Sequence, residues 1–224
     1  SLVYNSLLIV DSLLIFKYLG AKALGYYSII FGQNNIFILF PFAMGTATLP
    51  YLSRKFGEGE GISRLKDFML FRTSAIVSLM SVFVILSYLF LPYAIRIFMP
   101  QYVPGIQAAR IALLGTIFFS VGILLQNFLV TINKQIYCLF ILFVTLILKI
   151  SLIYVFIQRG MGINGVAVAT NIAYFALSTS MVMMVAYHCK DSLIGAFKHL
   201  IKIYAPFFLL ILVLIYFNHS KKIY

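Results

Sequence analysis

Apolar stretches of membrane-spanning length, separated by short polar breaks, constrain this chain more than any other feature. A bilayer core about 30 Å thick needs roughly 20 apolar residues per helix. Seven stretches of that kind occur, at approximately residues 2–19, 26–52, 73–92, 111–132, 136–157, 163–187 and 203–217. Only 10% of the residues are charged and the mean hydropathy is +1.05, which is unlike a soluble domain. The sequence therefore predicts an all-α, polytopic helical membrane protein of about seven spans.

The spans divide into a lobe and an extension. We expect residues 1–187 to form a six-helix lobe and residues 188–224 to add a surface helix and a further, incomplete span. The stretch 193–202 mixes apolar residues with Lys198 and Lys202, a pattern typical of a helix lying in the membrane surface. The first span starts at Ser1 with no charged leader, so we expect the chain to be part of a longer protein.

Basic residues give the chain a net charge of +12 and lie mostly at the ends of spans. There they orient helices and meet anionic lipid, so they do not indicate a nucleic-acid partner. Their excess is concentrated between residues 53 and 72, which predicts a cytoplasmic location for that loop and for the start of the chain. Arg96, Arg110 and Arg159 are expected at the outer interface.

One acidic residue, Asp11, interrupts the first span. It precedes the turn at Gly20 by nine residues, which places it roughly 14 Å below the outer face, where a charge is costly unless it is neutralised. Lys17 lies about 120° away on the same helix and cannot be its partner. The glycine spacing that follows Gly20 recurs at Gly160, which predicts a second turn at the same face. Lys149 lies some ten residues before that turn, at a matching depth in the fifth span. We therefore predict that Asp11 and Lys149 form an intramembrane pair facing a cavity, with a purely structural pair as the alternative.

Three consecutive amides, Gln33, Asn34 and Asn35, lie at the same depth in the second span. They cannot all face lipid, so we expect them to line a cavity. Pro41 and Gly45 are expected to interrupt this span and to free backbone groups, as in transporter cavities.

The fourth span carries polar residues on one face. Thr116, Ser120, Asn127 and Thr131 fall within about 60° of one another at 100° per residue. Hydrogen bonding between helices and lining of a cavity both explain such a stripe. In the sixth span, small residues at Gly165 and at 169 and 173 predict a helix in the interior of the lobe.

Catalytic chemistry has no support in the sequence. Asp11 is the one acidic residue inside a span, and the three histidines lie at or outside span ends. No paired carboxylates, activated nucleophile or metal-ligand set can be assembled in the membrane. Cys138 and Cys189 have neither the number nor the spacing of a disulfide framework. We expect a non-enzymatic protein without metal or cofactor, and coupling to a proton or sodium gradient stays open. A channel would need a repeated filter segment, and none is visible.

Three segments, 10–29, 49–57 and 162–170, resemble the C-terminal half of polysaccharide flippases. These are the O-antigen type exporters of the MATE-related multidrug/oligosaccharidyl-lipid/polysaccharide superfamily. The resemblance implies two six-helix lobes around a central cavity, with this chain as the second lobe. It also implies transport of an undecaprenyl diphosphate-linked oligosaccharide across the bacterial inner membrane. Where many relatives have a basic residue after the aspartate, this chain has Ser12.

The expected mechanism is alternating access by rocking of the two lobes. The expected partners are the lipid-linked oligosaccharide, membrane lipids, and a polysaccharide polymerase with other envelope assembly proteins of lipopolysaccharide synthesis. Two alternatives stay open. One is a drug or metabolite cation antiporter of the same architecture, in which Asp11 would bind a proton or cation. The other is a membrane scaffold of an envelope polymer assembly that does not transport.

Overall fold

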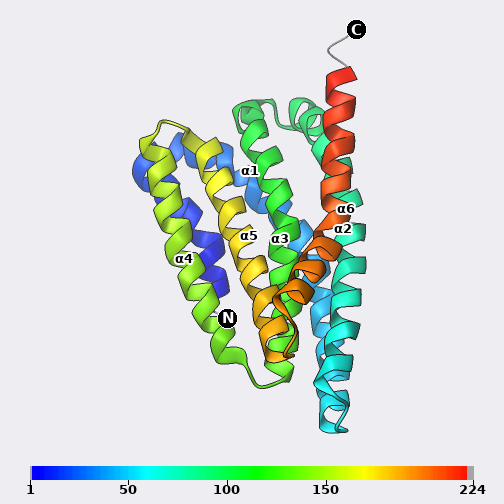
Figure 1. Ribbon diagram of the computed structural model, residues 1–224. Helices are drawn as coiled ribbons and strands as arrows, with labels where there is room; N and C mark the ends of the chain where they lie inside the picture. The colour runs from blue at the N-terminus through cyan, green and yellow to red at the C-terminus, as the bar shows by residue number, and fades with distance from the viewer. Residues whose placement is uncertain (1, 221–224) are drawn as a thin grey trace.

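The computed structural model describes residues 2–220 and consists of helices joined by short loops (Figure 1). The elements are α1 (Leu2–Gly57), α2 (Ile62–Phe98), the short 3-10 helix η1 (Pro100–Gly105), α3 (Ile106–Thr131), α4 (Gln135–Gln158), α5 (Gly162–His188) and α6 (Leu193–Ser220). No strand occurs within the described residues. Among the described residues, five helices are long and apolar enough to cross a membrane. The predicted all-α, multi-pass membrane architecture is confirmed.

Glycines make the turns at one end of the bundle. Helix α1 contains the first two predicted spans, which meet at Gly20, where φ is +84° and ψ is 174°. Such a backbone conformation favours glycine because a Cβ atom would be strained there. Gly160, which lies between α4 and α5, and Gly162, the first residue of α5, have φ values of +74° and +54°. Both turns predicted from the glycine spacing are therefore present.

The predicted interruption of the second span is wrong. Gly20 is the single residue of α1 with non-helical dihedral angles, so the helix continues through Pro41 and Gly45. Proline lacks an N–H group, which leaves the carbonyl of Phe37 without its helical donor but does not unwind the backbone here. At Gly45 a Cβ atom would lie 2.4 Å from Nδ2 of Asn127. This glycine therefore allows close packing of α1 on α3.

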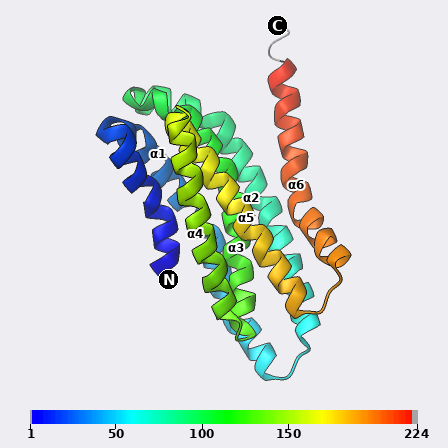
Figure 2. The same ribbon diagram turned by 60° about the vertical axis from the view of Figure 1, so that its left-hand side comes forward.

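The loops gather at two opposite ends of the bundle (Figures 1 and 2). Loops 58–61, 132–134 and 189–192 lie at one end, which we call the Gly59 end. The turn at Gly20, η1 and loop 159–161 lie at the other, which we call the Gly20 end. This alternation is what antiparallel spans require. Placing the Gly59 end in the cytoplasm remains a prediction.

Helix α3 forms the centre of the bundle and packs against α1, α2 and α5. Most of its side chains are buried along its whole length. Gly115 allows the close approach of α5, because a Cβ atom there would lie 2.0 Å from Oδ1 of Asn171. In α5, the predicted ladder at Gly165, Ala169 and Ala173 is buried as well. The inward position of this ladder is confirmed, although α3 is the central helix.

Helix α6 packs against α2 and α5 and stands at the edge of the bundle in Figure 2. It runs unbroken through Pro206, so the predicted surface helix 193–202 and span 203–217 are one helix. No loop divides the two parts, and the location of residues 193–202 in the membrane surface remains a prediction. Rings of Phe118 and Phe175 meet those of Tyr204 on α6 at centroid distances of 5.4 and 5.8 Å. Of the predicted extension 188–224, residues 221–224 lie outside the described residues.

Candidate functional site

The structure brings Asp11 and Lys149 together inside the bundle. Nζ of Lys149 lies 2.8 Å from Oδ1 of Asp11, and the two residues are 0% and 5% exposed. The contact joins the first segment of α1 to α4, and it is the pairing expected from their equal depths. A role of this pair in transport remains a prediction.

Two hydroxyl groups complete the surroundings of Asp11. Its Oδ2 atom accepts hydrogen bonds from Tyr27 at 3.1 Å and from Thr170 at 3.2 Å. Tyr27 follows the Gly20 turn in α1, and Thr170 belongs to α5. The carboxylate therefore connects both segments of α1 to α5 as well as to α4. Hydrogen bonds to a charged group contribute about 1.5–3 kcal/mol each.

Lys149 has polar and aromatic neighbours besides Asp11. Its ammonium group donates a hydrogen bond to the carbonyl of Leu7 and lies 5.0 Å from the ring centroid of Tyr174. A cation over an aromatic face is favourable, more so when water is excluded. The lysine is thus held on three sides by groups that stabilise a positive charge.

Sequence reasoning missed Tyr27, Thr170 and Tyr174. Tyrosines near span ends are usually interfacial anchors, yet Tyr27 is 1% exposed. A usable signal was the distance from the turns. Tyr27 lies seven residues after Gly20 and Thr170 lies eight after Gly162, close to the depth of Asp11 on the far side of each turn.

The three predicted amides have different environments. Gln33 is buried, and its Nε2 atom donates a hydrogen bond to the carbonyl of Ala109 in α3 at 3.1 Å. Asn34 is half-buried and Asn35 is exposed. The side-chain oxygens of Gln33 and Asn34 are buried without a hydrogen-bond partner among the described residues. The amides thus provide both a bond between helices and unsatisfied acceptors.

A cavity of about 950 Å³ lies between α1, α2 and η1. Its wall is mainly apolar and includes Phe37, Phe40 and Phe83, with Gln33, Ser28 and Ser87 as polar members. Gln33 is the one predicted site residue on this wall. The Asp11–Lys149 pair lies inside the bundle and does not border this cavity, because Tyr27, Thr170 and Tyr174 surround it.

The polar stripe of α3 lies in the packed interior. Thr116 and Ser120 are buried, and their hydroxyl groups donate to carbonyls of their own helix, those of Leu113 and Thr116. Thr131 donates to the carbonyl of Asn127, which is half-buried against Gly45. In this structure none of the four borders the 950 Å³ cavity. The interpretation as a substrate-lining stripe therefore remains a prediction, and the observed contacts are those of helix packing.

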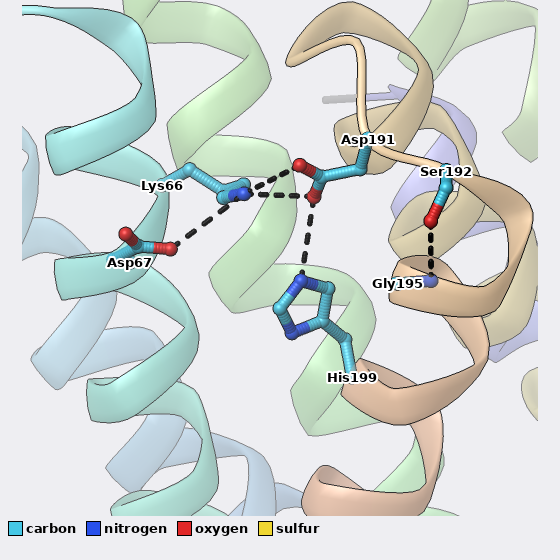
Figure 3. A network of polar contacts seen from close by, with 6 residues as sticks. All are labelled: Lys66, Asp67, Asp191, Ser192, Gly195 and His199. Atoms are coloured by element: carbon cyan, nitrogen blue, oxygen red, sulfur yellow. Dashed lines mark hydrogen bonds and ion pairs between the residues drawn. The ribbon is translucent and has the colours of Figure 1, made fainter.

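A second ionic cluster lies at the Gly59 end (Figure 3). Lys66 at the start of α2 contacts both carboxylate oxygens of Asp191 at 2.7 and 2.8 Å and lies 3.6 Å from Asp67. His199 of α6 lies 3.3 Å from Asp191. Burial alone would raise the pKa of Asp191, but the hydrogen bonds and charge of Lys66 outweigh it and lower that pKa. Sequence reasoning used Lys66 only to orient the chain and missed this link between α2 and α6.

The polar contacts described above are ion pairs and hydrogen bonds that join helices to one another. Within residues 2–220, no group of three or more His, Cys, Asp or Glu side chains could hold a metal ion. Comparison with known proteins gives one positive result, since the model of the MatE family matches residues 1–155. Searches among curated proteins and among solved structures returned no match. This match, over more than half of a multi-pass helical chain, shows that the protein belongs to the MatE family of membrane transporters.

Proposed function

We propose that this lobe belongs to an exporter that moves an undecaprenyl diphosphate-linked oligosaccharide across the bacterial inner membrane by alternating access. The observation that carries the proposal is the mainly apolar cavity with Gln33 on its wall. Oε1 of Gln33 is a buried acceptor without a partner among the described residues. A lipid-linked sugar has an apolar chain that suits the apolar wall, and it has hydroxyl groups that can donate a hydrogen bond to Gln33.

The orientation of the Gln33 amide follows from its contact. The carbonyl of Ala109 can only accept a hydrogen bond, so the nitrogen must face it and the oxygen is the end that lacks a partner. A buried polar atom without a partner costs about 1–3 kcal/mol. A sugar hydroxyl donating to Gln33 would remove that cost. Asn34 also has a buried oxygen without a partner among the described residues, but it does not line this cavity.

The charges favour this substrate over a cationic drug. A cation antiporter needs a carboxylate that can meet the substrate or the coupling ion. The cavity wall has none, and Asp11 is already paired with Lys149. The other acidic residues lie at the Gly59 end, in loop 58–61 or in the ionic cluster of Lys66 (Figure 3); they are Glu58, Glu60, Asp67 and Asp191. A neutral sugar therefore suits this lobe better than a cation.

The Asp11–Lys149 pair serves the mechanism by holding the lobe together. Alternating access by rocking requires each lobe to move as a rigid body. The pair and its hydroxyl partners tie the first segment of α1 to α4 and α5, so this segment moves with its lobe. In this proposal Lys149→Ala abolishes transport while membrane insertion persists.

The test uses the full-length protein in a strain that lacks its own polysaccharide flippase. Gln33→Leu is expected to reduce surface polymer and to cause lipid-linked oligosaccharide to accumulate on the inner side. Ser151→Leu is the matched control, because Ser151 is an exposed polar residue of α4 away from the cavity. If the protein confers drug resistance and has no effect on surface polymer, the flippase proposal is wrong and a drug antiporter explains the result. A correctly inserted protein that shows neither polymer export nor drug resistance would support the alternative of a membrane scaffold that does not transport.

A further inference from the structure

A second cavity, of about 520 Å³, lies at the Gly20 end where α2, η1 and α3 meet. It shares no lining residue with the larger cavity. Two arginines line it, Arg96 near the end of α2 and Arg110 in the second turn of α3. Gln107 and the apolar residues Val103 and Pro104 complete this part of the wall.

Arg110 is held in place by Tyr88. Its Nε atom donates a hydrogen bond to the carbonyl of Tyr88 at 3.1 Å, and its guanidinium lies 4.7 Å from the centroid of the tyrosine ring. These contacts use Nε and one face of the guanidinium. They leave its terminal nitrogens without a bond to any described residue. A fixed guanidinium loses less freedom when it binds an anion with two parallel hydrogen bonds.

Gln107 adds neutral donors to the same wall. Its Oε1 atom accepts a hydrogen bond from Nδ2 of Asn164 at 3.1 Å. The oxygen is therefore engaged, and the side-chain NH₂ group is the end available to a ligand. The cavity thus combines two positive charges with an uncharged donor.

Among the described residues, no carboxylate forms an ion pair with either arginine. Of the five acidic residues, Asp11 is paired inside the bundle. Glu58 and Glu60 belong to loop 58–61, and Asp67 and Asp191 belong to the ionic cluster of Lys66 (Figure 3), so these four lie at the Gly59 end. Two like charges on one cavity wall repel each other, so an anion from outside the chain would stabilise them. Planar guanidinium groups match the oxygens of a phosphate.

We propose that this cavity binds a phosphate group at the membrane surface. Phosphate groups reach this end of the bundle on phospholipid headgroups, on a lipid-linked diphosphate, or as free phosphate. Val103 and Pro104 provide apolar contacts that favour a lipid-borne group over the free ion. This site is separate from the proposed sugar path and does not depend on it.

The experiment titrates the delipidated full-length protein in detergent with dioleoyl phosphatidylglycerol and counts bound lipid by native mass spectrometry. Arg96→Gln and Arg110→Gln should each weaken binding on the order of tenfold. Arg159→Gln is the control, since Arg159 is an exposed arginine at the same end that does not line the cavity. Unchanged binding in both cavity variants, or an equal loss in the control, would overturn the proposal.

Two further arms identify the source of the phosphate and guard against misfolding. Displacement of the lipid by millimolar inorganic phosphate would show that the phosphate group binds by itself, whereas tighter binding of undecaprenyl diphosphate would assign the site to the lipid carrier. Arg110→Lys keeps the charge but loses the planar fork, so binding should fall as in Arg110→Gln. Full binding by the lysine variant would show that positive charge alone attracts the lipid, and it would overturn the proposal of a specific phosphate site. Arg96 is exposed, so its variant should keep the unfolding temperature of the parent.

Discussion

Removing one member of the Asp11–Lys149 pair should damage the protein more than removing both. The pair is fully buried, and each charge is the only opposite charge within ion-pair distance of the other among the described residues. Breaking a buried pair by removing one partner costs about 3–5 kcal/mol, because the remaining charge is stranded. Replacing both by neutral residues of similar volume costs much less. We therefore expect a strong coupling between Asp11→Asn and Lys149→Met.

The structure also predicts which single change is worse. After loss of Lys149, Asp11 keeps two hydroxyl donors, those of Tyr27 and Thr170. After loss of Asp11, Lys149 keeps one carbonyl and the face of Tyr174, with no negative charge nearby. Asp11→Asn should therefore approach the upper end of the range of about 3–5 kcal/mol, and Lys149→Met the lower end.

The assay is thermal unfolding of the full-length protein in detergent with a dye that fluoresces on reaction with thiols. The buried Cys138 makes unfolding of this lobe visible. At about 2–4 °C per kcal/mol for a unit of this size, the single variants should unfold about 6–20 °C lower than the parent. Ser12→Ala is a neighbouring control on the same helix, at a residue outside the pair.

The outcome of the double variant decides the matter. It should regain a large part of the lost unfolding temperature, even if transport does not return. An interaction energy above about 0.5 kcal/mol in the double-mutant cycle would show the coupling. Strict additivity of the two losses would refute the reasoning and leave Asp11 in need of another partner.

Three further predictions concern packing, pH and topology. Gly115→Ala should destabilise the lobe by about 1–3 kcal/mol, because the new Cβ atom would lie 2.0 Å from Oδ1 of Asn171. Gly25→Ala is the control, since the space around Gly25 is open. Equal unfolding temperatures for the two variants would contradict this prediction. The lowered pKa of Asp191 means that its contact with Lys66 stabilises the fold above the ordinary value of 3.8 and is lost as the pH falls through the lowered pKa. The difference in unfolding temperature between the parent and Lys66→Met should therefore shrink between pH 7 and strongly acidic pH, and a constant difference would argue against the ion pair. Gly61→Cys, at an exposed position with an ordinary φ of −62°, should react with a membrane-impermeant thiol reagent only from the cytoplasmic side, and labelling from outside would invert the topology.

The sequence by itself determined the features that depend on distance along a helix. Span length against bilayer thickness predicted the multi-pass helical architecture, and glycine spacing predicted the turns at Gly20 and Gly160. The contact of Asp11 with Lys149 was predictable for the same reason. Each residue advances a helix by a fixed rise, so counting from a turn gives membrane depth, and equal depth is necessary for contact.

Only the tertiary structure decided which side chains face one another across helices. The burial of Thr116 and Ser120, the position of Gln33 on a cavity wall and the link from Lys66 to Asp191 and His199 all depend on how each helix is rotated about its axis and which helices are neighbours. Nearly every face of these helices is apolar, so the hydrophobic pattern gives little information on rotation. Packing of small residues and a few polar contacts decides it instead, because lipid is as apolar as the side chains and provides no preference between faces.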